Sequence, residues 1–176
     1  MHPFWDFSLR LYAKPGVADA CLFVQDRFGM NVNLILFCIW YADSGGGSLS
    51  AEDITTTLRR IADWEEHVIK PLREIRRKSR HEPLGVPEFL LDIFRPRIDA
   101  VELEAEHVEQ LILAEFVRGS ESSAERAEDA ASDAVSSLEN YCGELDIERD
   151  AQLTECLNSI VQAAYAGAHL PASAND

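Results

Sequence analysis

The pattern of hydrophobic and polar positions predicts a helical protein with its most apolar helix at the centre. Hydrophobic side chains fill the stretch from Val32 to Tyr41 almost without interruption, with Asn33 as its one polar residue. A short apolar run of this kind suits a buried strand as well as a buried helix. The chain has no second strand-like run to pair with it. We therefore predict a central helix from Val32 to Ala42, capped at its start by Asn31 or Asn33.

Apolar residues spaced three and four apart place further helices on either side of this segment. They predict one helix over residues 3–13 and another over residues 15–29, where the final glycine suits a left-handed cap. Ser50 has the character of a helix N-cap before an acidic first turn. Pro71 lies inside the long helix that follows, so this helix should kink or restart near Lys70.

Two long apolar seams should pack together as an antiparallel helical pair. The first follows Ser50, the second covers residues 88–117, and a turn rich in proline separates them. The seam residues are Ile54, Leu58, Ile61, Val68, Leu72 and Ile75 in the first helix, and Leu91, Phe94, Ile98, Val101, Ala105, Val108, Ile112 and Phe116 in the second.

The composition changes after residue 118, where a small, polar and acidic stretch precedes two helices with alanine-rich stripes. Alanine buries less apolar area than leucine, so we expect this pair to be looser, or to be completed by a partner. The predicted architecture is an all-α, single-domain helical bundle around a buried central helix. Its parts are a core (1–118), an acidic C-terminal helical extension of the same domain (119–166) and a disordered tail (167–176).

Charge and cysteine usage narrow the class of protein. The formal net charge is -15, which argues against binding to nucleic acids or anionic membranes. The N-terminus lacks the pattern of a secretory signal, and the apolar run is about half of the roughly 20 residues that span a bilayer. The four cysteines show no metal or disulfide spacing. We expect a cytoplasmic protein without a metal or cofactor.

Eight of the sixteen basic residues lie between positions 59 and 80, against this acidic background. Arg73, Arg76, Arg77 and Arg80 are three and four apart and form a candidate surface for a protein partner. Two alternatives stay open. The arginines can pair internally with the acidic residues of 99–150, or they can hold the phosphates of RNA or a nucleotide.

A second candidate site surrounds the start of the apolar run. Gln25, Asp26 and Asn33 can line the mouth of a small pocket walled in part by Trp40, or they can cap helix ends. Glu65 lies on the first apolar seam and is a candidate for acid–base chemistry, or for a structural bond to an arginine or an indole. One carboxylate without an identified base defines no reaction, so we predict no catalytic residue.

Two helical carboxylate–histidine pairs have spacings that resemble those of metal ligands. Glu104 and His107 fit one half of a di-iron site, and Asp63 with His67 is a looser pair. At about 100° per residue, both histidines point away from their apolar seams. We therefore expect both on solvated faces and predict no metal site.

The N-terminal part of the chain contains a series of short motifs, namely Phe4-Trp5, Leu11-Tyr12-Ala13-Lys14-Pro15-Gly16-Val17, Ala20-Cys21-Leu22, Gln25-Asp26, Gly29, Val32-Asn33-Leu34, Phe37-Cys38 and Trp40. These motifs resemble those of a small, uncharacterised proteobacterial family of about 160 residues. The family is a domain of unknown function, so the resemblance implies no activity and transfers no catalytic residue.

These observations predict a non-enzymatic protein-interaction adaptor or regulator that uses the basic surface around Arg73 to Arg80. The alternative is a small-ligand-binding protein or enzyme with an apolar pocket near Trp5, Trp40 and Trp64. The two differ in what the protein should bind, which is another protein in the first case and a metabolite in the second.

Overall fold

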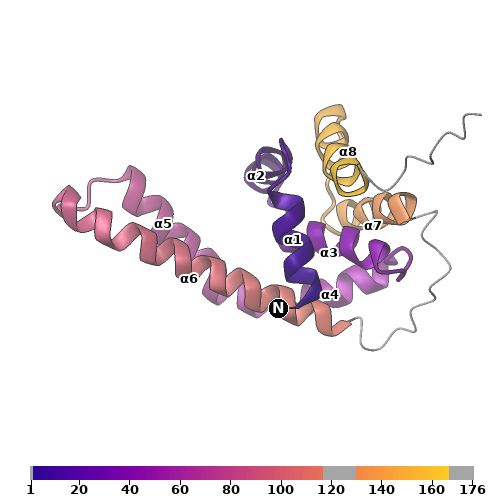
Figure 1. Cartoon of the computed structure of the whole chain (residues 1–176), viewed down its shortest axis with the longest axis horizontal. Helices are drawn as coiled ribbons and strands as arrows, with labels where there is room; N and C mark the ends of the chain where they lie inside the picture. Colours follow the sequence, from indigo (N-terminus) through magenta and orange to yellow (C-terminus); the bar gives the residue numbers. More distant parts are fainter. Residues whose placement is uncertain (1, 117–129, 167–176) are drawn as a thin grey trace, which may run out of the picture.

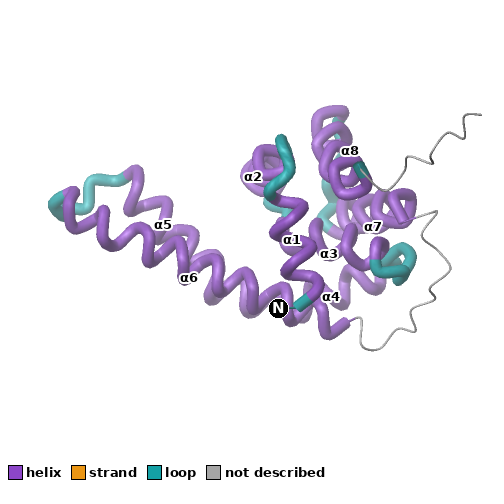
Figure 2. Tube along the Cα trace, in the orientation of Figure 1, coloured by secondary structure: helices purple, strands orange, loops and turns teal. Residues whose placement is uncertain are grey.

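The computed structural model describes residues 2–116 and 130–166, which form helices joined by short connections (Figures 1 and 2). No strand occurs in those two ranges, so the predicted all-α class is confirmed. None of the helices described there is long and apolar enough to cross a membrane. In chain order the elements are α1 (Pro3–Tyr12), α2 (Val17–Phe28), α3 (Val32–Asp43), α4 (Ala51–Trp64), the π-helical turn η1 (Glu65–Ile69), α5 (Lys70–His81), α6 (Glu88–Ala114), α7 (Ala130–Glu144) and α8 (Ala151–Tyr165).

The helix α3 lies at the centre of the fold, as the apolar run predicts. Most of its side chains are buried, and α1, α2, α6 and α7 pack against it. The Asn31 side chain accepts a hydrogen bond from the Leu34 backbone N–H at 3.0 Å, which confirms the predicted cap. A helix covered on several sides can be apolar around its whole circumference, and this explains the nearly continuous run.

Local signals set the ends of the neighbouring helices. Gly29 follows α2 with a φ of 68°, the left-handed conformation that glycine adopts without strain. Ser50 and Asp53 form a reciprocal capping box at the start of α4. Both predictions from the sequence are confirmed.

The turn η1 divides the long helix that the first seam predicts. A π-helical turn takes up one extra residue, so α5 continues from α4 with its faces rotated. Pro71 is the second residue of α5 and follows η1 without a break, so a carbonyl of the preceding helical turn receives no N–H bond from it. The predicted restart near Lys70 is confirmed.

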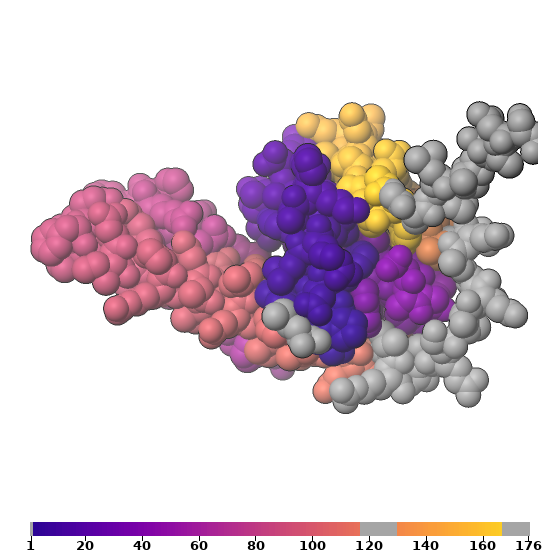
Figure 3. Space-filling view, viewed as in Figure 1, coloured from indigo at the N-terminus to yellow at the C-terminus, as the bar shows by residue number. Residues whose placement is uncertain are grey.

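The helices α5 and α6 form an antiparallel pair that projects from the rest of the molecule (Figures 1 and 3). We call α5, the following loop and residues 88–103 of α6 the arm. The predicted pairing is correct, but the predicted seam of α6 is wrong in part. Phe94, Val101 and Val108 are exposed, whereas Glu102 and Glu109 are buried. The reason is that polar groups from distant elements bind these two carboxylates and turn this face inward.

The C-terminal pair packs into the core. Ala134, Leu138 and Tyr141 are buried on α7, which lies against α3, while α8 lies against α2. The alanine-rich stripe of α7 is therefore completed by α3 of the same chain. The lower stability expected for this pair stays a prediction. Most of the acidic stretch and the predicted tail (167–176) lie outside the described residues.

Candidate functional site

Two adjoining hollows lie where the arm leaves the body, and we call them together the polar groove. The first has a volume of about 370 Å³ and lies between α1, α2, the start of α3, α5 and α6. The second, of about 590 Å³, lies between α2 and α5. The two share Leu22, Gln25 and three arginines. The polar side chains that line the first hollow include Ser8, Gln25, Asn33, Arg73, Arg76, Arg80, Asp99, Glu102, Glu106 and Gln110.

The structure brings the two sets of candidate residues to this one place. Gln25 and Asn33 line the first hollow together with Arg73, Arg76 and Arg80. Asp26 and Arg77 line the second hollow. Helix α2 faces α5 across the groove, so residues about 50 positions apart in the sequence share its surface.

Two of the predicted pocket residues line neither hollow. The Trp40 ring stacks on Phe4, with ring centroids 5.0 Å apart, and belongs to the aromatic packing between α1 and α3. Glu65 lies in the first position of η1. The first hollow lies at the start of α3, where Trp5 lines it and Trp40 does not.

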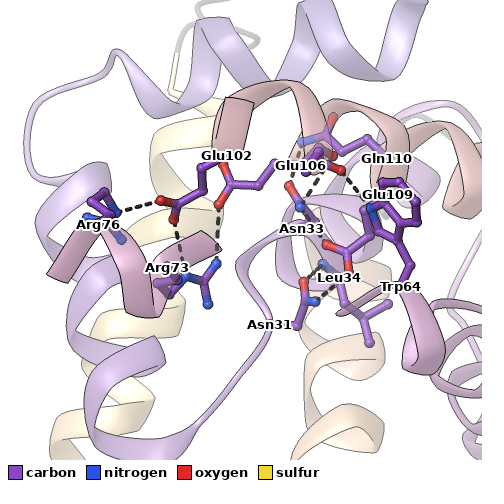
Figure 4. Close-up of polar contacts among 11 residues, drawn as sticks. Asn31, Asn33, Leu34, Trp64, Arg73, Arg76, Glu102, Glu106, Glu109 and Gln110 are labelled. Atoms are coloured by element: carbon purple, nitrogen blue, oxygen red, sulfur yellow. Dashed lines mark hydrogen bonds and ion pairs between the residues drawn. The ribbon is translucent and has the colours of Figure 1, made fainter. Parts of the chain in front are cut away.

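Ion pairs to α6 hold three of the four candidate arginines. Arg76 Nε lies 2.6 Å from one Glu102 oxygen, and Arg73 Nε lies 3.4 Å from the other. Arg73 also reaches Glu106 at 3.2 Å, and Arg80 reaches Asp99 at 2.6 Å (Figure 4 shows the first three contacts). Internal pairing, one of the alternatives left open by the sequence, therefore holds for these three.

A buried network of amides and carboxylates lies next to these ion pairs (Figure 4). Asn31 and Asn33 each donate a side-chain N–H to a different oxygen of Glu109, at 3.0 and 2.6 Å. Gln110 Nε2 donates to Asn33 Oδ1 at 2.8 Å, and Ser8 Oγ donates to Gln110 Oε1 at 3.0 Å. The network ties α1, α3 and α6 together at the floor of the groove. Asn31 thus serves both as a helix cap and as a member of the network.

Glu109 belongs to the acidic residues that the sequence offers as partners for the arginines, but in the structure it binds Asn31 and Asn33 instead. Its side chain is 1% exposed, and burial raises the pKa of its carboxyl to about 7 although the two asparagine bonds oppose the shift. Burial also raises the pKa of Glu106, against the influence of Arg73. The signal in the sequence was the pair Glu109 and Gln110 near the end of an apolar helix, but only the fold shows that amides of α3 meet it.

One of the two histidines that were predicted to lie on solvated faces is in an aromatic contact instead. His107 stacks on Trp5 with centroids 4.3 Å apart, so it is half-buried and the predicted solvated position is wrong. The reason is that α1 packs against this side of α6. His67 is exposed, as predicted. No group of three or more histidine, cysteine or acidic residues in the described ranges could hold a metal ion.

Comparison with known proteins gives one match. The model of a family described as a protein of unknown function (DUF2390) matches residues 3–113. This range includes all residues that line the polar groove. No match was found among curated proteins or among solved structures. The match spans well over half of the chain, so the chain belongs to this family of unknown function.

Proposed function

We propose that this protein is a non-enzymatic adaptor or regulator that binds an acidic, amphipathic segment of a partner protein in the polar groove. The observation that carries the proposal is the charge of the hollow between α2 and α5. Five cationic side chains line it, against two carboxylates, Asp26 and Glu74. The cationic residues are Lys70, Arg73, Arg76, Arg77 and Arg80.

The ion pairs to α6 leave binding capacity on these arginines. A guanidinium group carries five N–H donors. Arg76 and Arg80 each make one side-chain contact with α6, and Arg73 makes two. Arg77 makes no ion pair with a described residue and is exposed. The remaining donors suit carboxylates of an incoming chain, and the ion pairs that are already formed hold the guanidinium groups in place.

The rim of the first hollow favours a protein segment over a single ion. Exposed apolar side chains surround the hollow on three helices, namely Leu9, Tyr12, Leu22 and Leu103. A charged floor with an apolar rim suits an amphipathic segment, which buries apolar residues while its carboxylates reach the arginines.

The test is site-specific photo-crosslinking in cells. A photoreactive residue at Leu9 or Leu103 should crosslink to one defined protein, whereas the same residue at Gln152, which is exposed on α8, should not. Arg77→Glu should reduce the yield at Leu9 several-fold. The matched control is Arg59→Glu, an equal charge change at another exposed arginine. Equal yields at groove and control positions, or equal effects of the two variants, would contradict the proposal.

A second candidate function is small-ligand binding in the first hollow, because its volume lies in the range of ligand pockets and Trp5 lines it. An anionic metabolite at 100 times its dissociation constant should add about 2.7 kcal/mol to the free energy of unfolding. It should also change the fluorescence of the native protein but not that of Trp5→Phe. A screen of such metabolites that changes neither quantity would remove this candidate.

A further inference from the structure

The outer side of α6 carries an apolar stripe that no described element covers. Five of its side chains are large, apolar and 39–47% exposed, namely Leu90, Phe94, Val101, Val108 and Leu111. In Figure 3 the outer end of the arm projects away from the other described elements. Soluble proteins rarely leave such a long row of apolar side chains without a partner.

The spacing of this outer stripe is that of a coiled-coil seam. The apolar positions, together with Arg97 and Glu104, follow one another at alternating intervals of four and three residues. At about 100° per residue, these positions fall within an arc of about 100°. A period of 3.5 residues is typical of a helix that pairs with another helix along its length. The stripe is about 21 residues long and therefore measures roughly 30 Å.

The two charged residues of the outer stripe indicate what covers it. Arg97 and Glu104 lie at equal distances on either side of the midpoint, which falls between Ala100 and Val101. Both are exposed, and neither makes an ion pair with any residue in the described ranges. When a second copy of the same helix runs antiparallel to the first, the positive residue of each copy lies opposite the negative residue of the other. Opposite charges at equal distances from a midpoint are therefore complementary in an antiparallel pair.

We infer that this protein self-associates through the outer stripe of α6, in an antiparallel pair with a two-fold axis between Ala100 and Val101. In this register Arg97 of each copy lies opposite Glu104 of the other, so two interchain ion pairs form. Leu90 lies opposite Leu111 in the same register. A parallel pair would instead place like charges opposite one another, which costs free energy.

Further apolar residues support this register. Ile93 is 55% exposed and lies opposite Val108 of the second copy, so this pairing is apolar, as is that of Leu90 with Leu111. Phe94 lies opposite the half-buried His107 in this register. The small Ala100 at the axis lets the two helix backbones approach closely. Two arms joined in this way bring four helices together, and each α6 then contacts its own α5 on one face and the second α6 along the outer stripe.

The first measurement is the mass of the full chain in solution as a function of concentration, by light scattering or sedimentation equilibrium. The expected result is a reversible dimer of twice the 19.7 kDa chain mass. A chain that stays monomeric up to roughly 1 mM would overturn the inference.

The second measurement identifies the surface and the orientation. Arg97→Glu and Glu104→Arg each place like charges opposite one another, and each should weaken dimerisation at least about tenfold. The double variant with both changes should restore wild-type affinity, because the opposite charges meet again. Glu155→Arg, a matched change on an exposed residue of α8, should leave the affinity unchanged.

Three results would overturn the inference, namely single variants that dimerise as the wild type does, a double variant without recovery, and a loss of affinity in Glu155→Arg equal to that in Glu104→Arg. Both charged side chains of the stripe are exposed, so the folded chain should tolerate these changes, which circular dichroism can verify.

The outer stripe and the polar groove lie on different faces of α6 and share no residue. The crosslinking test and the dimerisation test can therefore fail independently.

Discussion

At the residue scale, Glu109 should make the stability of the protein depend on pH. Burial raises the pKa of this carboxyl from an ordinary value of 4.5 to about 7. Between these values the folded protein holds a proton that the unfolded chain has released. The contribution of this group to stability is therefore complete below pH 4.5 and is lost as the pH rises through 7. The total loss in the free energy of unfolding is roughly 3 kcal/mol.

The variant Glu109→Gln tests this prediction because it cannot titrate. Urea unfolding from pH 5 to pH 8 should show the stability of the wild type falling relative to that of the variant, by up to roughly 3 kcal/mol. Glu115→Gln, at an exposed position near the end of α6, should show no such relative change. A constant difference between the wild type and Glu109→Gln would show that Glu109 does not bind a proton in the folded state near neutral pH.

The sequence predicts contacts between residues close together in the chain better than contacts between distant residues. The caps at Asn31 and Ser50 could be predicted, because each bond joins residues three positions apart. The bond from Asn33 to Glu109 joins residues 76 positions apart, and no periodicity points to it. Gln25 and Asn33 were identified as candidates for a pocket mouth, but their arginine neighbours across the groove became visible only in the fold.

At the scale of elements, η1 sets the rotation of the arm relative to the body. Its extra residue rotates α5 by about 100° relative to a continuous α-helix, which lets Arg73 and Arg76 meet Glu102 while α4 packs against α7. Deletion of Glu66 should convert the turn to α-helix and break one of these two sets of contacts.

The expected result of the Glu66 deletion is selective loss of order in the arm. Backbone amides of α5 and of the first half of α6 should exchange hydrogen much faster, whereas those of α3 should keep most of their protection. Glu66→Ala keeps the chain length and removes only an exposed ion pair with Lys70, so it should exchange nearly as the wild type does. Similar exchange in the deletion variant and in Glu66→Ala would show that the π-helical turn does not determine how the arm packs.

Element positions were predicted better than element faces. Capping residues, glycines and prolines act locally, so the helix boundaries and the restart at Lys70 followed from the sequence. The buried face of α6 could not be predicted in this way, because apolar residues of this helix were expected to be buried and charged residues to be exposed. In the structure Arg73, Arg76 and two asparagines bury the carboxylates of α6. Apolar residues such as Val101 consequently remain exposed and are available for the contact that we infer.

At the scale of the whole molecule, the all-α class and the central position of α3 could be predicted, because one long apolar run without a strand partner has few other solutions. The arm and the polar groove could not. Both depend on how α5 and α6 leave the body, and this direction is set by contacts between distant elements. The same limit applies to α7, whose thin alanine stripe gave no sign that it covers α3.

The family match ends at residue 113, but the fold of this chain depends on helices beyond it. The Tyr141 hydroxyl accepts a hydrogen bond from the Asn31 backbone N–H at 2.8 Å, and Ser137 accepts one from the Leu49 N–H at the same distance. Leu138 and Tyr141 are almost fully buried among the residues of the central core. Loss of α7 would expose the apolar side of α3 to water and leave these two donors without their partners.

A chain shortened to residues 1–116 should therefore lack a cooperative thermal transition. Addition of a second chain of residues 130–166 should restore the transition, because α7 and α8 can then cover α2 and α3 in trans. The matched control is the second chain with Leu138→Asp, which places a charge at a buried position and should not restore folding. If the shortened chain melts as cooperatively as the full chain, the first six helices fold alone, and α7 is an addition to a stable family domain rather than part of its core.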